Sequence, residues 1–153
     1  MKTQHHSSCR GFSLVELLIV AAIIGLIVAI AIPNLVNAIQ RGRQSRTVGD
    51  ARGISTSIAM YQQDYAKYPV AASLEDAEVL RPHLLPYMAN YGALDGWQRP
   101  FMYISDGDHY TLVSYALNGI ADTPWVQGTT NYFDDDIVIN DGNWLQVPEG
   151  TQE

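Results

Sequence analysis

The chain has 153 residues, of which 47% are hydrophobic and 16% are charged, and its formal net charge at pH 7 is −7. This length suits one domain with a modest core. The excess of acidic residues argues against general nucleic-acid binding, which depends on basic side chains that neutralise phosphates.

A polar, basic segment opens the chain and precedes a long apolar stretch. Residues 1–10 include Lys2 and Arg10 and no acidic residue, which favours a cytoplasmic location for this end. The apolar stretch runs from Phe12 to Ile32, with Glu16 as its only charged residue. About 21 helical residues rise roughly 31 Å, close to the ~30 Å hydrocarbon core of a bilayer. Because a secretory signal has an apolar core of only about 7–15 residues, the sequence predicts a membrane-spanning helix.

The start of this stretch resembles the N terminus of the type IV pilin and type II secretion pseudopilin superfamily. The residues that carry the resemblance are Gly11, Phe12, Ser13, Leu14, Glu16, Leu17, Leu18 and Ile19, followed by Pro33. The resemblance implies that a prepilin peptidase cuts after Gly11 and that Phe12 becomes an N-methylated N terminus. It also implies that Glu16 pairs with the Phe12 amine of a neighbouring subunit during assembly. The position of Glu16 near the end of the apolar stretch also allows another interpretation, in which its carboxylate reaches the nearby lipid headgroups.

Removal of residues 1–11 would leave seven basic and 16 acidic residues. It would also remove Cys9, the only cysteine, so the mature chain could form no disulfide. Many type IV major pilins close their C-terminal region with a disulfide. Its absence here favours a pseudopilin over a pilin.

The helical pattern is predicted to continue beyond Pro33, which should kink or loosen the helix. Pro69 disfavours helical geometry at the residue before it, so we expect one helix from about Ser13 to Ala66. An apolar face of this helix is predicted to be core, at Ile54, Ile58, Tyr61 and Tyr65. A basic collar precedes that face and consists of Arg41, Arg43, Arg46 and Arg52. The collar is either a solvated face beside anionic headgroups or a contact surface for the acidic heads of adjacent subunits.

The remaining residues predict short elements separated by turns. Ser73 is a candidate N-cap for a short helix that ends at Leu80. Alternation predicts a strand through Phe101 and Tyr103, a hairpin turn at Asp106–Gly107 and a returning strand over 109–117. The inward face of the returning strand is predicted to hold Tyr110, Leu112, Ser114 and Ala116. A strand is expected over 137–139, a turn over 140–143, and either a last strand or a covering segment over 144–147.

These strands resemble the head of the major pseudopilin. The fold class expected is therefore α+β, with a long N-terminal helix packed on a small antiparallel sheet. The helix would have a transmembrane half and an amphipathic half. The resemblance implies three segments: a prepilin leader over 1–11, a transmembrane and assembly helix over 12–33, and a periplasmic head over 34–153 that includes the second half of the helix.

The C-terminal third is acidic and contains a long loop that suits calcium. Calcium takes six to eight oxygen ligands from carboxylates and carbonyls. Major pseudopilins hold calcium here, and the resemblance implies Leu117, Asn118, Asp134 and Asp136 as the ligands in this chain. Asn118 stands where an aspartate is expected, which removes one charge. The alternative is an acidic loop that is only solvated.

The function implied is that of a structural subunit of a type II secretion pseudopilus, a helical filament that helps to export folded proteins across the outer membrane. The implied partners are further copies of the chain, the prepilin peptidase, the inner-membrane assembly platform, minor pseudopilins and the membrane itself, with no nucleic acid. The head would lie in the periplasm, first on an inner-membrane anchor and then in the filament. The alternatives are a type IV pilin for adhesion, motility or DNA uptake, and a membrane-anchored periplasmic enzyme or binding module. Because no GxSxG, HExxH or glycine-rich phosphate loop occurs, we expect no enzymatic activity.

Overall fold

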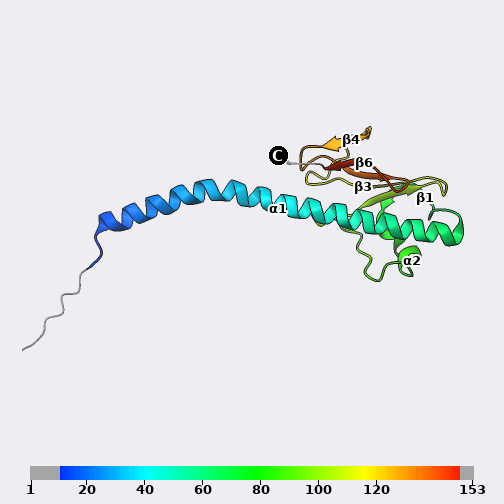
Figure 1. The fold of residues 1–153 in the computed structure, drawn as a ribbon, viewed down its shortest axis with the longest axis horizontal. Coiled ribbons are helices and arrows are strands. Elements are labelled where there is room, and N and C mark those ends of the chain that lie inside the picture. Colours follow the sequence, from blue (N-terminus) through cyan, green and yellow to red (C-terminus); the bar gives the residue numbers. More distant parts are fainter. Residues whose placement is uncertain (1–10, 149–153) are drawn as a thin grey trace, which may run out of the picture. The chain divides into compact units, whose positions relative to one another are not determined.

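The structure, a computed structural model, describes residues 11–148, so residues 1–10 of the leader predicted over 1–11 lie outside the described part. The chain divides into two compact units, Met1–Val36 and Asn37–Glu153. Helix α1, Leu14–Tyr65, runs from the first unit into the second (Figure 1). The sequence expectation of one helix from about Ser13 to Ala66 is confirmed to within one residue at each end.

In the first unit, α1 is apolar and exposed along its whole length. Every described residue up to Val36 is exposed, and the helix is long and apolar enough to cross a membrane. Pro33 lies inside the helix without ending it. The Asn34 side-chain amide donates to the Ile30 carbonyl over 3.2 Å. The helix therefore continues past Pro33, as the pattern predicts.

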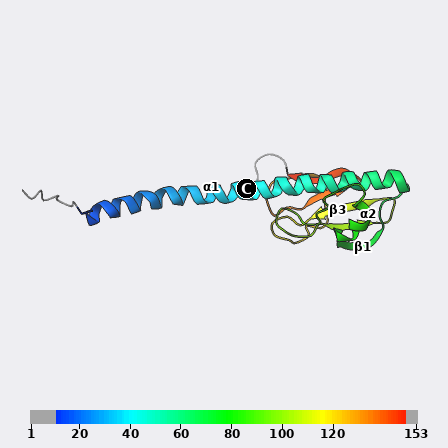
Figure 2. The same ribbon diagram turned by 90° about the horizontal axis from the view of Figure 1, so that it is seen from below.

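The second unit contains a six-stranded sheet in the order β1-β2-β3-β5-β6-β4. Its strands are β1 Ala71–Asp76, β2 Met102–Ser105, β3 Tyr110–Ser114, β4 Gly128–Thr130, β5 Ile137–Asn140 and β6 Asn143–Pro148. Neighbouring strands are antiparallel except β4 and β6, which are parallel. Figures 1 and 2 show these strands beside the second half of α1. The fold is thus α+β, with a long N-terminal helix packed on a sheet.

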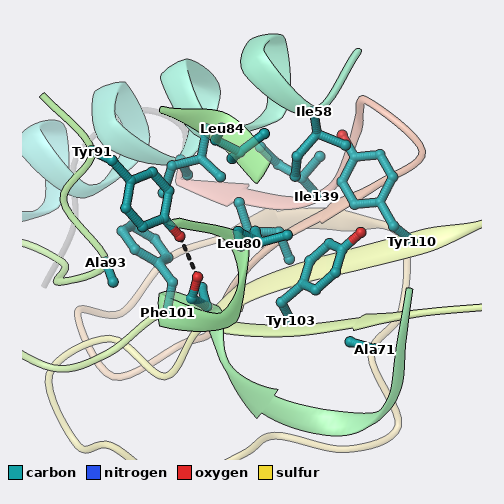
Figure 3. Packing of buried hydrophobic residues seen from close by; sticks show 14 residues of the cluster. Ile58, Ala71, Leu80, Leu84, Tyr91, Ala93, Phe101, Tyr103, Tyr110 and Ile139 are labelled. Carbon is teal, nitrogen blue, oxygen red and sulfur yellow. Dashed lines mark hydrogen bonds between the residues drawn. The ribbon is translucent and has the colours of Figure 1, made fainter. Parts of the chain in front are cut away.

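The core lies between the second half of α1 and the sheet. Ile54 and Ile58 of α1 are fully buried, and so are Phe101 and Tyr103 from the strand side. Figure 3 shows Leu80 between the helix and the strands. The inward face predicted for the returning strand is confirmed, since Tyr110, Leu112, Ser114 and Ala116 are all buried.

Three local predictions were wrong or incomplete. Residues 71–76 form strand β1, because they pair with β2, and the helical turn after this strand is capped by Asp76 rather than Ser73. That turn is a 3-10 helix, η1 Ala77–Leu80, with the Asp76 carboxylate accepting from the Glu78 amide over 2.8 Å. Tyr65 is 63% exposed because α1 ends there, and its ring stacks on Tyr61. The short helix α2, Arg81–Leu84, and strand β4 were not expected.

Candidate functional site

The predicted processing and assembly residues lie at the start of α1. Gly11 and Phe12 precede the helix, and the Phe12 side chain is 81% exposed. Glu16 lies in the first turn, where its Oε2 accepts the backbone N–H of Ser13 over 2.9 Å. The Ser13 hydroxyl in turn accepts the Val15 amide over 3.3 Å. Glu16 therefore caps its own helix with one oxygen, an arrangement close to a capping box.

The surface of α1 in the first unit is apolar and exposed. The exposed large side chains of this apolar surface extend from Phe12 to Val36. Contiguous exposed apolar patches beyond a few hundred Å² mark contact with a membrane or another protein. This half of α1 therefore requires lipid or other helices around it.

The basic collar is only partly engaged within the chain. Arg46 pairs with Asp50 over 3.3 Å, and Arg52 lies over the Trp144 ring at 5.3 Å from its centroid. Arg41 and Arg43 form no ion pair with any of residues 11–148. Both are exposed, so their charges are available to headgroups or to another molecule.

Asp136 is the buried centre of the acidic loop. It is 0% exposed, and its Oδ2 accepts the Asp122 amide over 2.9 Å and the Trp125 indole N–H over 2.7 Å. The Asp136 amide donates back to the Asp122 carboxylate over 3.2 Å. These contacts hold two carboxylates together although 14 residues separate them in the sequence.

The other oxygen of Asp136, Oδ1, is buried without a hydrogen-bond partner among the described residues. Burial raises the pKa of Asp136, and the hydrogen bonds from Asp122 and Trp125 oppose that shift. The negative charges of Asp122 and Asp135 raise the pKa further. A buried carboxylate oxygen that lacks a donor is costly, and a cation would satisfy it.

The other three predicted ligands, Leu117, Asn118 and Asp134, have different surroundings in the structure. The Leu117 amide donates to the Phe133 carbonyl over 3.1 Å, which brings Leu117 beside the segment that ends in Asp136. Asn118 Oδ1 accepts the Ile120 amide over 2.8 Å within its own turn, and Asp134 is exposed. Among residues 11–148, no three His, Cys, Asp or Glu side chains are grouped as metal ligands. The fit to calcium therefore rests on Asp136 Oδ1, nearby carboxylates and main-chain carbonyls.

Asp122 is the residue that the sequence analysis missed. It lies 14 positions before Asp136, at no spacing that a metal motif would indicate. Only the folding of the loop brings the two residues together. The presence of an acidic residue inside a long acidic loop was the one available signal.

The hairpin between β2 and β3 carries a second group of polar side chains. His109 Nδ1 lies 2.8 Å from Asp141 Oδ2, and the His109 side chain is 76% exposed. Asp106 accepts the backbone amides of Asp108 and His109 over 2.9 and 2.7 Å. These backbone hydrogen bonds lower the pKa of Asp106. Asp106 thus stabilises the turn, which is a structural use of its carboxylate.

Two protein-family profiles match the chain. The prokaryotic N-terminal methylation motif matches residues 6–32, and the type II secretion system protein G family matches residues 34–128. A type II secretion system core protein G of Klebsiella michiganensis is 31% identical over 142 residues, covering 90% of this chain and 94% of the relative. That of Dickeya chrysanthemi is 29% identical and covers 88% and 86%. That of Escherichia coli K12 is 28% identical and covers 72% and 83%. No solved structure gave a significant match.

Proposed function

The chain belongs to the type II secretion system protein G family, and from this premise we propose how the molecule works. It is a pseudopilin, a structural subunit of a type II secretion pseudopilus. The family is structural, so the chain acts by assembling and not by catalysing a reaction. The filament of such subunits helps to export folded proteins across the outer membrane.

One observation carries this proposal: the first half of α1 is apolar and entirely exposed. In the membrane, lipid covers this surface. In the filament, the same surface packs against the helices of neighbouring subunits, and van der Waals packing replaces the contacts with lipid. The apolar surface therefore stays covered when a subunit leaves the bilayer and joins the filament.

Processing prepares the helix for assembly. The prepilin peptidase cuts after Gly11, and Phe12 becomes the methylated N terminus. The match to the N-terminal methylation motif over residues 6–32 supports this step. Gly11 and Phe12 lie before the first turn of α1, so the peptide bond between them is outside the helical hydrogen-bond ladder.

Glu16 pairs with the Phe12 amine of a neighbouring subunit. Its Oε2 is used by Ser13 in its own chain, whereas Oε1 has no hydrogen bond to residues 11–148. In an apolar environment an unpaired charge is unfavourable, so the free oxygen of the Glu16 carboxylate favours pairing with a cationic group. The pairing thus fixes the axial position at which a new subunit joins the filament.

The proposal also includes the membrane anchor of the subunit and its assembly partners. The apolar helix holds the subunit in the inner membrane, with the basic residues Lys2 and Arg10 on the cytoplasmic side and the head in the periplasm. Further copies of the chain, the peptidase, the assembly platform and minor pseudopilins are its partners. Membrane lipid surrounds the helix before assembly.

The acidic loop holds a calcium ion at Asp136. The buried, unpartnered Oδ1 of Asp136 supports this, together with the main chain around Leu117. When bound, the ion neutralises the carboxylates and fixes the loop. The residues of this chain that orient the site are Asp122 and Trp125, which hold the other oxygen of Asp136.

The function is tested by complementation in bacteria that carry a type II secretion system and lack its own protein G. The chain should restore release of the secreted enzymes into the medium and appear in sheared filaments.

Gly11→Val should leave an unprocessed precursor, seen by mass spectrometry, and should not restore release. Gly25→Val is the control for processing alone, because Gly25 lies in the apolar helix 14 residues beyond the cleavage site and nothing lies within 4 Å of a Cβ there. Normal processing of Gly11→Val would refute the cleavage site.

A further inference from the structure

We infer that Asp122 supplies the second carboxylate of the calcium site, in addition to Asp136. This inference deepens the calcium proposal above and rests on it. The observation that carries it is the reciprocal pair of hydrogen bonds between Asp122 and Asp136, in which the backbone amide of each residue donates to the carboxylate of the other. Each carboxylate is thereby held at the backbone amide of the other residue.

The unpartnered oxygen points to a ligand. Asp136 Oδ2 already accepts two hydrogen bonds, from Asp122 and Trp125, whereas Oδ1 accepts none from the described residues. Asp136 is 0% exposed, so water does not satisfy Oδ1 from bulk solvent. Calcium binds carboxylate oxygens such as this one, and neighbouring carboxylates and carbonyls supply its remaining ligands.

The residues around Asp136 are acidic. Asp122 and Asp135 are the acidic residues whose charges act on Asp136. Within residues 11–148, no basic side chain forms an ion pair with any of these three residues. A buried carboxylate with further carboxylates beside it and no counter-charge is unfavourable. A divalent cation supplies the missing positive charge.

Three other candidates for the second side-chain oxygen are less suitable. The Asn118 oxygen is occupied by the Ile120 amide in its own turn. Asp134 has no hydrogen bond to Asp122 or Asp136 among the described residues. Asp135 uses Oδ2 to accept the Asn131 and Tyr132 amides over 3.0 and 2.9 Å. Asp122 is thus the acidic residue that is tied directly to Asp136.

The test is a calorimetric calcium titration of the full chain in detergent micelles. Asp122→Asn keeps an oxygen that can accept the Asp136 amide but removes the charge, so calcium affinity should fall by about tenfold or more. Asp134→Asn and Asn118→Ala are the controls and should bind calcium like the wild type. Near-UV circular dichroism without calcium checks that each variant is folded.

A second measurement needs no variant. On addition of calcium to the wild-type chain, the side-chain carboxyl ¹³C resonances of Asp122 and Asp136 should shift together, and that of Asp134 should stay in place. A wild-type chain that binds no calcium refutes the calcium proposal itself. Binding that Asp122→Asn leaves unchanged, or a shift at Asp134 in place of Asp122, overturns the assignment of Asp122 while leaving the calcium site standing.

Discussion

The Gly96 amide donates to the Thr47 hydroxyl over 2.9 Å, which ties the turn before β2 to helix α1. Thr47 is fully buried, and its hydroxyl donates to the Arg43 carbonyl over 3.0 Å. One residue further on, the Trp97 indole donates to Gln40 Oε1 over 2.7 Å. This turn thus fixes the head against the half of α1 that belongs to the second unit.

We predict that Gly96→Ala destabilises the head. A Cβ at this position would lie 2.1 Å from the Arg43 carbonyl oxygen, and backbone cannot move aside as a side chain can. Overpacking of this kind typically costs 1–3 kcal/mol, and we expect about 2 kcal/mol or more in the free energy of unfolding. Denaturant unfolding of the full chain in micelles, followed by near-UV circular dichroism, measures it. Gly92→Ala is the control, because nothing lies within 4 Å of a Cβ there. Equal stability of the two variants would contradict the close contact.

Asp95→Ala should be more damaging than Asp95→Asn. The Asp95 carboxylate is 0% exposed and accepts the amides of Trp97 and Arg99 over 2.8 and 2.9 Å and the Ser114 hydroxyl over 2.7 Å. Alanine leaves these donors without an acceptor, at about 1–3 kcal/mol for each donor that stays buried, so a loss of about 3 kcal/mol is expected. Asparagine keeps one acceptor oxygen. The same unfolding measurement distinguishes them, with exposed Glu75→Ala as the control. A similar loss for both Asp95 variants would argue for charge, not hydrogen bonding, as the cause.

The sequence predicted the parts of the fold that depend on local pattern. The alternation around Tyr103 and the Asp106–Gly107 turn were enough to place the β2–β3 hairpin, because a strand with one buried face has period two. The helix end near Tyr65 was predicted from Pro69. Residues 71–76 could not be assigned in this way, since strand pairing with β2 decided their structure over a weak helical signal.

The candidate site residues also divide into those that the local sequence could predict and those that depend on the folded chain. Glu16 and Gly11 are contiguous in sequence with the apolar helix, so their place at its start could be predicted. Asp122 could not, because its contact with Asp136 depends on the path of a loop that contains the unexpected strand β4. Asn118 was predicted as a ligand from the resemblance to major pseudopilins, and in the structure its side-chain oxygen accepts the Ile120 amide within its own turn.

The pair of His109 and Asp141 should make the stability of the head depend on pH. The hydrogen bond and charge of Asp141 raise the pKa of His109 in the folded chain, and the charges of Asp106 and Asp108 add to this effect. The pair's contribution is therefore fully present below the unfolded-state pKa of about 6.5 and is lost as pH rises through the higher folded-state value.

His109→Gln should accordingly reduce the decrease in melting temperature between about pH 6 and about pH 8. Thermal melts of the full chain in micelles at several pH values provide the measurement. His83→Gln is the control, because His83 packs edge-on against Tyr61 and forms no ion pair with the described residues. The same pH dependence in wild type and His109→Gln would show that Asp141 is not a significant partner.

Glu16→Gln separates the two uses of the Glu16 carboxylate. Glutamine can accept the Ser13 amide as glutamate does, since both residues serve in a capping box, so helix formation and membrane insertion should be unchanged. It carries no charge, so it cannot form an ion pair with the Phe12 amine of another subunit. We therefore expect normal processing and membrane levels, with few or no filaments in sheared fractions and no restored secretion. Gln63→Glu is a control for a change of charge on exposed α1 surface and should assemble. Wild-type filament yield from Glu16→Gln would mean that capping, and not pairing between subunits, is the reason for a carboxylate at this position.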